Sequence, residues 1–377
     1  MDEFLKPGEA AILLTGSSAR GDENPYSDVD LQRFVAANPK QTESVIGNGR
    51  LVSLSETTLE QARASLHHPE QSLWVAPGLR QGRILSDPTG ALAQLQAAAE
   101  PPPKLDGRDW SRAAVRGWSE EAHKLLAALS SHDEEMAVAP LWGLSEGLTR
   151  AVAVQQRIYI ETENRYFSTV LEQTPAAWSD CLRRAVGLVA GDLSQRCRAA
   201  LQLYLLTVEL LEVEDPVVAH TCGRIQAPLL ARLRPDQQEL YLPMRCDLWP
   251  DVDNSHAAEV AELVASNRPD YRCYLAEDPC SGEVFGLVEL GLYRDRPPYG
   301  SGTTAFVDGL YVRPELRGRG LGEALLRAAI DELRCWHCDH IGSDTWAWHT
   351  QSRRLHQRCG FVVIEETEKE VGFLLAG

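Results

Sequence analysis

The chain has 377 residues and a mass of 41.7 kDa, a length that predicts two or three domains. It contains no uninterrupted apolar run of about 18 residues, which excludes a predicted membrane span. The net charge of -17, without any cluster of Lys and Arg, excludes nucleic acid as the expected partner and favours small cationic substrates.

The first ten residues, MDEFLKPGEA, carry acidic groups where a secretory signal carries positive charge. We therefore expect no export peptide and a cytoplasmic location. Nine cysteines lie between Cys181 and Cys359, an odd number that does not form the dense framework of a small secreted domain. The thiols are expected to be reduced.

Short apolar runs alternate with a helical pattern over residues 10–100. AILLTG (11–16), DLQRFVA (30–36) and RLVSLS (50–55) are typical of strands, and TLEQARASL (58–66) is typical of a helix. The prolines of PPPK (101–104) lack the backbone donors that a helix or a sheet needs, so they indicate a linker. The sequence thus predicts an α/β domain over residues 1–104.

A group of polar residues surrounds the first two predicted strands. Gly16 and Ser17 form a turn after the first strand, and Asp28 and Asp30 begin the second. Alternate positions of a strand point the same way, so both carboxylates can reach one Mg²⁺ ion. Residues 10–100 resemble the nucleotidyltransferases of the polymerase β superfamily, which include adenylyltransferases that modify aminoglycosides. The resemblance implies that Gly16 and Ser17 contact the phosphates of ATP and that Asp28 and Asp30 hold Mg²⁺.

That family normally supplies a third carboxylate from a later strand. Here RLVSLSETT offers Ser53 and Ser55, and Glu56 follows just past the predicted strand. Three hypotheses remain open. The domain transfers nucleotide slowly, it recruits Glu56 or an acid from the following segment, or it binds nucleotide without reacting and serves as a sensing or interaction module.

Residues 109–233 are rich in Ala and Leu with helical periodicity, as in SEEAHKLLAAL (119–129). We expect a helical bundle over residues 105–238. Such a bundle often helps the nucleotidyltransferases mentioned above to bind substrate.

The pattern becomes α/β again over residues 239–377. A helix is predicted at HAAEVAELVA (256–265), with strands at YRCYLAE (271–277), EVFGLVELGLY (283–293) and AFVDGLYV (305–312). The predicted fold class is therefore multidomain: an α/β domain, a central all-α bundle and a second α/β domain with a mixed sheet.

A glycine-rich turn joins the strand that ends at Val312 to the next predicted helix. Arg317, Gly320 and Gly322 lie at this junction. Glycine lets backbone amides approach an anion closely, and the helix amino terminus adds unpaired donors, so the turn suits a pyrophosphate. The alternative is an ordinary strand-to-helix turn with solvated arginines.

The turn resembles the acetyl-coenzyme A loop of the GNAT N-acetyltransferases, and the resemblance extends over residues 242–377. Three segments more narrowly resemble aminoglycoside 6′-N-acetyltransferases: MRCDLWPD (244–251), FVDGLYVRPELRGRG (306–320) and GSDTW to LHQRCGF (342–361). The resemblance implies acetyl-coenzyme A as the acetyl donor, an aminoglycoside as acceptor and a homodimer. The residues implied in coenzyme binding are Leu310, Tyr311, Val312, Arg317, Gly318, Arg319, Gly320, Leu321 and Gly322.

Acetyl transfer to an aliphatic ammonium requires a group that removes its proton. Asp308 is the predicted base, at the position where the family commonly has a glutamate. By the same resemblance Asp344 binds the substrate, and Trp249 lies against it, since sugar faces and ammonium groups stack well on aromatic rings. Glu365 is predicted to join them, although a solvated surface position is the alternative for this residue.

His356 lies where many acetyltransferases of this superfamily have a tyrosine near the leaving thiolate. Two interpretations remain open: it protonates the thiolate, or it belongs to the core. Trp348 and His349 stand where the 6′-acetyltransferases usually have Asp-Asn. This departure leaves the substrate range open, and a protein or polyamine acceptor is the alternative. CWHCDH (335–340) is interpreted as the end of a helix rather than as a metal site.

Overall fold

The computed structural model describes residues 11–40, 42–100, 102–250, 255–266 and 268–375. Residues 1–10, for which no export peptide is expected, lie outside these ranges. So do the first proline of PPPK, residue 101, and the last residue of MRCDLWPD, residue 251. The chain forms two compact units, which are treated separately below. Unit 1 comprises residues 1–118, 146–180 and 206–215, and unit 2 comprises residues 119–145, 181–205 and 216–377.

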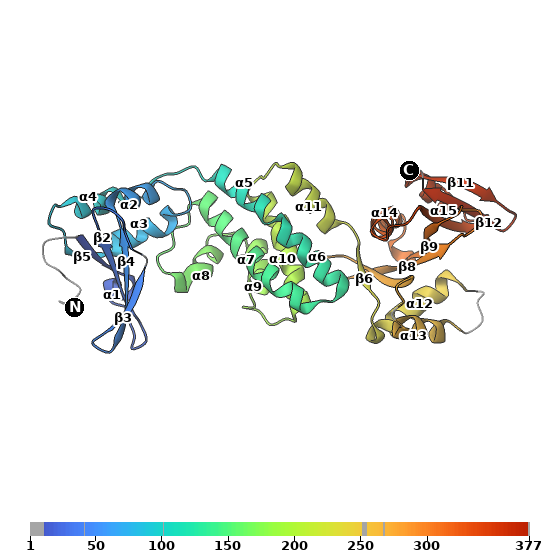
Figure 1. Cartoon of the computed structure of the whole chain (residues 1–377), viewed down its shortest axis with the longest axis horizontal. Coiled ribbons are helices and arrows are strands. Elements are labelled where there is room, and N and C mark those ends of the chain that lie inside the picture. The colour runs from blue at the N-terminus through green and yellow to red at the C-terminus, as the bar shows by residue number, and fades with distance from the viewer. Residues whose placement is uncertain (1–10, 41, 101, 251–254, 267, 376–377) are drawn as a thin grey trace. The chain divides into compact units, whose positions relative to one another are not determined.

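Unit 1 contains a five-stranded sheet in the order β3-β4-β2-β1-β5. β2 and β4 run parallel, and the other neighbours are antiparallel. Its strands are β1 (Ala11–Thr15), β2 (Val29–Phe34), β3 (Glu43–Gly47), β4 (Arg50–Thr57) and β5 (Arg83–Ser86). The accompanying helices are α1 (Gly16–Arg20), α2 (Leu59–Leu66), α3 (Ser72–Gln81) and α4 (Ala91–Ala98). Figure 1 shows α2, α3 and α4 together beside this sheet.

Strand β1 shows why this sheet has two apolar faces. Ala11 and Leu13 pack in a cluster with side chains of α2, α3 and α4, whereas Ile12 and Leu14 pack in a second cluster beside α1. Because successive side chains of a strand point to opposite faces, one apolar run can fill both clusters.

The segment after the linker is helical, as predicted. Its helices are α5 (Arg108–Gly117), α6 (Ser119–Ser131), α7 (Glu134–Gln156), η1 (Glu163–Arg165), α8 (Tyr166–Leu171), α9 (Ala176–Ala185), α10 (Leu193–Leu210) and α11 (Pro216–Gln226). One short strand, β6 (Leu229–Arg232), falls inside the range expected to be all-helical and pairs with the sheet of unit 2. The predicted limits of the domains, 1–104, 105–238 and 239–377, stay a prediction.

Unit 2 contains a mixed seven-stranded sheet in the order β11-β12-β10-β9-β8-β7-β6. All neighbours are antiparallel except β9 and β10. The further strands are β7 (Tyr271–Glu277), β8 (Val284–Arg294), β9 (Thr303–Val312), β10 (His340–Trp346), β11 (Phe361–Glu366) and β12 (Glu370–Leu375). The helices that follow the bundle are η2 (Pro235–Gln237), α12 (Gln238–Leu248), α13 (His256–Ser266), η3 (Pro314–Leu316), α14 (Leu321–Arg334) and α15 (Thr350–Arg358).

Both faces of this sheet are covered by helices. Tyr241 and Met244 of α12 and Val260 of α13 pack with Leu275 and Leu287 of the sheet in one cluster. Side chains of α14 pack against the other face, where β8, β9 and β10 contribute to a larger cluster. The parallel pair β9–β10 therefore lies inside the sheet, as parallel strands usually do.

The predicted multidomain α/β and all-α fold class is confirmed, with the predicted strands and helices in place. The short elements β3, β5, α3 and α4 were not predicted from the sequence. Within the described ranges, none of the helices has the length and apolar character that crossing a membrane requires.

Candidate functional site

Strands β9 and β10 separate at the centre of the unit 2 sheet. Their parallel pairing runs from Thr304 opposite His340 to Val307 opposite Ser343 and ends there. On the other side of β9 the register shifts, because Leu290 is paired with Val307 and Glu289 with Gly309, which leaves Asp308 as the extra residue of a β-bulge. Bulges re-aim side chains next to active sites.

Asp308 is the first residue of β9 beyond the paired region. Its side chain is 17% exposed. The Tyr293 hydroxyl donates to Asp308 Oδ1 at 2.8 Å, and Asp308 Oδ2 is buried without a hydrogen-bond partner among the described residues. Burial raises the pKa of Asp308 to about 7, against the lowering effect of Tyr293 and of Arg296. A carboxyl with this pKa suits a general base near neutral pH.

Asp344 holds the equivalent place on β10, directly after the last residue paired with β9. Burial raises the pKa of Asp344 to about 6, and the positive charge of Arg296 opposes this shift. Arg296 lies between the two acids, with Nη1 3.7 Å from Asp308 Oδ1 and Nη2 3.6 Å from Asp344 Oδ2. The structure thus brings together the two carboxylates that the sequence singled out.

Arg296 and its surroundings were not found by sequence reasoning. The guanidinium carbon lies 3.7 Å from the ring centroid of Phe306 and 4.4 Å from that of Tyr293. Tyr299 is 5.6 Å away and fixes the loop by donating from its hydroxyl to the Ser343 carbonyl at 3.1 Å. An arginine among turn-forming residues has no periodic signal that would mark it as part of a site.

Trp249 follows α12 and lies on β9 beside Asp308. A methyl group placed on Gly309 would meet Trp249 Cη2 at 2.6 Å, so the ring packs directly on the backbone of the bulge. Its ring lies 5.1 Å from the Arg245 guanidinium carbon. Because the ring is half-buried, it leaves an aromatic edge near the predicted base.

Glu365 is exposed on β11 and is paired with Gly372 of β12, which is itself paired with Asp344 of β10. Glu365 and Asp344 therefore lie in one row that crosses β11, β12 and β10. Glu365 is at the outer end of this row, and its charge still contributes to raising the pKa of Tyr299.

A fully buried carboxylate lies behind the site. Glu289 is 0% exposed and accepts hydrogen bonds from the Tyr241 hydroxyl at 2.7 Å, Arg245 Nε at 2.7 Å and the Tyr271 hydroxyl at 2.6 Å. Buried charges are tolerated when they are paired and bonded in this way. The negative charge of Glu289 also raises the pKa of Asp308.

The loop between β9 and α14 has the open backbone that an anion needs. Gly318 and Gly320 adopt φ values of 79° and 83°, and nothing lies within 4 Å of where their side chains would be. No side chain caps α14 at Gly320. Arg317 donates from Nε to the Val312 carbonyl at 2.8 Å and stacks on Tyr311, which fixes the loop. These residues fit a pyrophosphate at the start of a helix of 14 residues.

The strand residues predicted to align the coenzyme are held by the sheet. Leu310 and Tyr311 are paired with Val288 and Leu287 of β8, and no strand of the described chain pairs with the opposite edge of β9 beyond Val307. The backbone along that edge is therefore available to a ligand. Arg319 is exposed on the loop, and Gly322 lies in the first turn of α14 with Leu321.

His356 is a core residue in the structure. It is 6% exposed, its Nδ1 lies 2.8 Å from the Ser352 carbonyl, and its Nε2 lies 2.9 Å from Ser343 Oγ. The ring stacks on Phe373 with centroids 4.6 Å apart, and burial lowers its pKa. These contacts favour the core interpretation over a proton donor to a thiolate.

The residues predicted to bind nucleotide and Mg²⁺ in unit 1 lie together near the start of β2. Asp28 precedes β2 and Asp30 lies within it, and a methyl group on Gly16 would meet Asp30 Oδ2 at 2.2 Å. Gly16 and Ser17 begin α1 directly after β1. Burial raises the pKa of Asp30, and the negative charges of Asp28 and Glu163 add to this effect.

The position beside the two aspartates is taken by Ser53, which is paired with Asp30 and donates to Asp28 Oδ2 at 3.2 Å. Glu56 is engaged elsewhere, with Arg33 Nη1 at 3.2 Å and with the Lys40 amide at 2.9 Å. Glu163 of η1 is the acid from the helical segment whose charge reaches Asp30. Among the described residues no group of three or more metal ligands forms.

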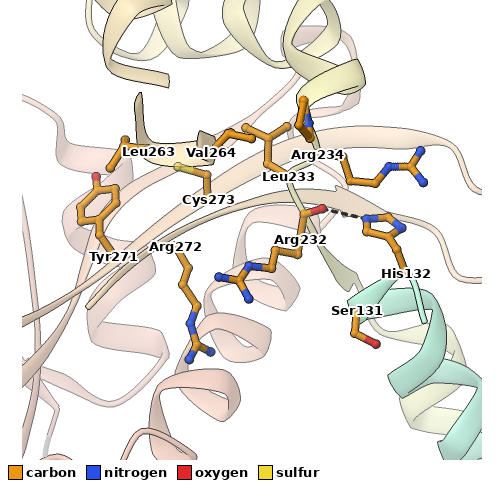
Figure 2. Close-up of a pocket in the computed structure, with 11 residues that line it drawn as sticks. Ser131, His132, Arg232, Leu233, Arg234, Leu263, Val264, Tyr271, Arg272 and Cys273 are labelled. Atoms are coloured by element: carbon orange, nitrogen blue, oxygen red, sulfur yellow. Dashed lines mark hydrogen bonds between the residues drawn. The ribbon is translucent and has the colours of Figure 1, made fainter. Parts of the chain in front are cut away.

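A pocket of about 260 Å³ lies elsewhere in unit 2, between the end of α6, β6, β7 and α13 (Figure 2). His132 Nε2 lies 2.7 Å from the Arg232 carbonyl at its rim. None of the residues predicted for catalysis or binding lines it. Its arginines are engaged: Arg272 pairs with Glu332 at 3.2 Å and Arg234 with Asp236 at 3.1 Å.

Two family models match the chain. Residues 234–361 match the acetyltransferase (GNAT) family, and residues 2–64 match the nucleotidyltransferase domain. The aminoglycoside N(6′)-acetyltransferase type 1 of Klebsiella aerogenes is 31% identical over 141 residues, which cover 37% of this chain and 93% of that protein. Its counterpart in Stenotrophomonas maltophilia is 32% identical over 151 residues, covering 39% of this chain and 92% of that protein.

A solved structure of the aminoglycoside N-acetyltransferase AAC(6′)-Iy in complex with CoA is 24% identical, covers 37% of this chain and 90% of that chain, and has a TM-score of 0.33. The relatives from Klebsiella and Stenotrophomonas are matched over nearly their whole length. Through its carboxyl-terminal part the chain belongs to the GNAT acetyltransferase family, among relatives named aminoglycoside N(6′)-acetyltransferases, and it carries a nucleotidyltransferase domain ahead of that part.

Proposed function

We propose that the protein transfers an acetyl group from acetyl-coenzyme A to the 6′-amino group of aminoglycosides. The observation that carries this proposal is the pair Asp308 and Asp344, placed side by side where β9 and β10 separate. Two carboxylates at the end of an open strand edge suit a cationic acceptor. Trp249 adds an aromatic surface on which a sugar ring and its ammonium groups can stack.

The glycine-rich loop and three carboxylates have roles in this reaction. The amides of residues 317–322 hold the pyrophosphate, and acetyl-coenzyme A supplies an activated thioester. Asp308, directly or through a water molecule, accepts a proton from the acceptor ammonium, so that the nitrogen has a free electron pair. The carbon–nitrogen bond forms as the carbon–sulfur bond breaks, and the released thiolate takes up the second proton, which the nitrogen loses as it becomes an amide. Asp344, with Glu365 at the edge, orients the remaining cationic groups.

Neomycin B and paromomycin test the position of transfer, because they differ in carrying an amino or a hydroxyl group at 6′. We expect thiol release from acetyl-coenzyme A with neomycin B and none with paromomycin. Asp308→Asn should lower kcat/KM roughly 10²- to 10⁴-fold, as expected for loss of a general base. Glu368→Gln, which removes an exposed carboxylate of the same unit, should leave it unchanged. Equal thiol release with both antibiotics contradicts the proposed position.

We propose that unit 1 binds ATP with Mg²⁺ at Asp28 and Asp30. The match of residues 2–64 to the nucleotidyltransferase domain supports this second function. Ser53 in place of an acid argues for slow transfer or binding alone, and Glu163 is the candidate third carboxylate. AMP transfer to an aminoglycoside hydroxyl, if present, should disappear in the double variant Asp28→Asn, Asp30→Asn. Retained nucleotide binding in that variant contradicts the assignment of the two aspartates.

We also propose that the protein works in the cytoplasm as a homodimer. The nine scattered cysteines, an odd number that does not form the dense framework of a small secreted domain, support a reducing compartment. The sheet of unit 2 ends in β6 and β11, and an edge strand can pair with a second copy. Light scattering of the purified chain measures the mass in solution, and a monomer at all concentrations contradicts the homodimer.

A further inference from the structure

The Arg296 guanidinium fills the space between the two carboxylates that the proposed function gives to the acceptor. Its nitrogens lie 3.7 Å from Asp308 Oδ1 and 3.6 Å from Asp344 Oδ2. Both distances exceed those of a hydrogen bond. Nη1 is buried and has no hydrogen-bond partner in the described part of the chain. Charge and ring stacking, rather than matched hydrogen bonds, therefore hold the guanidinium at this position.

The backbone around Arg296 is fixed more firmly than the guanidinium. The Tyr299 amide donates to the Arg296 carbonyl at 2.8 Å. The Asp295 amide donates to the Gly302 carbonyl, and the Gly302 amide donates to Asp295 Oδ1, both at 2.9 Å. These bonds close the loop. Stacking on Phe306 and Tyr293 is not directional in the way a bidentate ion pair is. The side chain can consequently leave while the loop stays in place.

We infer that Arg296 is a resident cation, which occupies the acceptor's ammonium position in the free protein and is displaced when a cationic acceptor binds. The inference rests on the proposed function. Asp308 is 17% exposed beneath the guanidinium, and it can take a proton from an acceptor only if that acceptor, or a water molecule that relays the proton, reaches it. Arg296 thereby sets the apparent affinity for the acceptor, because binding has to compete with an internal group.

The charged and titratable groups that face Asp308 come from several elements. They are Tyr293 and Glu289 of β8, Tyr271 and Cys273 of β7, Asp344 of β10 and Arg296 of the loop after β8. Arg296 alone among these carries positive charge. Its removal leaves two carboxylates facing each other, so both should hold their protons to higher pH. Acceptor affinity is therefore compared over pH 7 to 9, so that a changed protonation of Asp308 can be told apart from the loss of the guanidinium.

The test is steady-state acetylation of kanamycin A by the full chain and by Arg296→Gln at pH values from 7 to 9. The KM for kanamycin A should fall roughly 3- to 10-fold in the variant, since its site is no longer occupied. Millimolar methylguanidinium should compete with kanamycin A in Arg296→Gln and raise KM toward the wild-type value, with little effect on the wild type. Arg294→Gln, the loss of an exposed arginine two positions earlier, should keep the wild-type KM.

An unchanged or increased KM in Arg296→Gln, or the absence of competition by methylguanidinium, overturns the inference. If thermal melting shows that this variant does not fold, Arg296→Met replaces it, because its alkyl chain still packs on Phe306. Failure of the wild type to acetylate any 6′-amino aminoglycoside refutes the proposed function instead. Wild-type activity with an unaltered KM in the variant contradicts only the role of Arg296.

Discussion

Asp308 combines the two properties that a base for an ammonium substrate needs. It lies at an opening in the sheet, and burial raises its pKa to about 7. An ordinary exposed aspartate is ionised at neutral pH but is too weak a base to take much of an ammonium's proton. The bulge of β9 and the burial of Asp308 thus give the proposed base the position and the pKa that proton transfer needs.

The pH dependence of the reaction should report this group. Because Asp308 has to be ionised to act, kcat/KM for kanamycin A should fall as the pH decreases below about 7. Initial rates between pH 5 and 9, with the antibiotic and acetyl-coenzyme A each varied, measure this acid limb of the pH profile. An acid limb near pH 4, or the same limb in Asp308→Asn, contradicts the role of Asp308.

The same shift predicts an effect on stability. The folded-state pKa of Asp308 is raised, so its stabilising contribution is complete below the unfolded pKa of about 4 and is lost as the pH rises through about 7. Asp308→Asn should therefore melt about 2 to 6 °C above the wild type at pH 8. At pH 5 the two should differ less, because only part of this contribution is lost there. Circular dichroism melts at both pH values check this, and a destabilised variant at pH 8 contradicts the assigned environment.

At the scale of the elements, the site depends on how β9 meets its neighbours. β9 runs parallel to β10 only as far as Val307, and its bulge projects Asp308 next to the ring of Trp249. Trp249 directly follows α12, so the position of this helix determines where its ring packs on Gly309. The arrangement couples the packing of a helix to the position of a base.

Gly309→Ala tests this contact. The added methyl group would lie 2.6 Å from Trp249 Cη2 and 3.1 Å from Leu248 Cδ2, so the ring must move. We expect a loss of about 1–3 kcal/mol in stability and a roughly tenfold higher KM for the acceptor. Gly78→Ala, inside α3 with open space around it, is the control: it should keep the wild-type KM and be neutral or slightly more stable, because alanine is the better helix former. A KM that stays at the wild-type value in Gly309→Ala indicates that Trp249 does not contact the acceptor.

The sequence predicted the elements that carry strong local signals and missed groups that only the tertiary fold assembles. Alternation in AFVDGLYV and the glycines after it predicted a strand, a turn and a helix, because these depend on neighbouring residues. Arg296 joins Asp308 and Asp344 through a loop without periodicity, and Glu163 reaches Asp30 from a distant segment. Periodicity likewise does not tell a core histidine from a catalytic one, and the contacts that favour a core role for His356 could be seen only in the structure.

At the scale of the whole molecule, the chain joins two kinds of transferase domain with separate binding chemistries. Asp28 and Asp30 belong to unit 1, and Asp308 and Asp344 belong to unit 2. Acidic groups at both sites agree with the net charge of -17 and with a cationic substrate.

We expect the two sites to be chemically independent. The double variant Asp28→Asn, Asp30→Asn should acetylate kanamycin A at the wild-type rate in the absence of nucleotide. Thiol release measures this rate. A severalfold change in the acetylation rate on adding ATP with Mg²⁺ to the wild type, and its loss in the double variant, would instead identify unit 1 as a regulatory nucleotide-binding module.

The central claim is acetyl transfer to the 6′ nitrogen of an aminoglycoside. Its most direct test is nuclear magnetic resonance of the product formed from kanamycin A and acetyl-coenzyme A by the purified full chain. We predict a single acetyl group on the 6′ nitrogen, and no product with Asp308→Asn over the same time. Acetylation at another nitrogen, or no product while a protein or polyamine amine is acetylated, would contradict the claim.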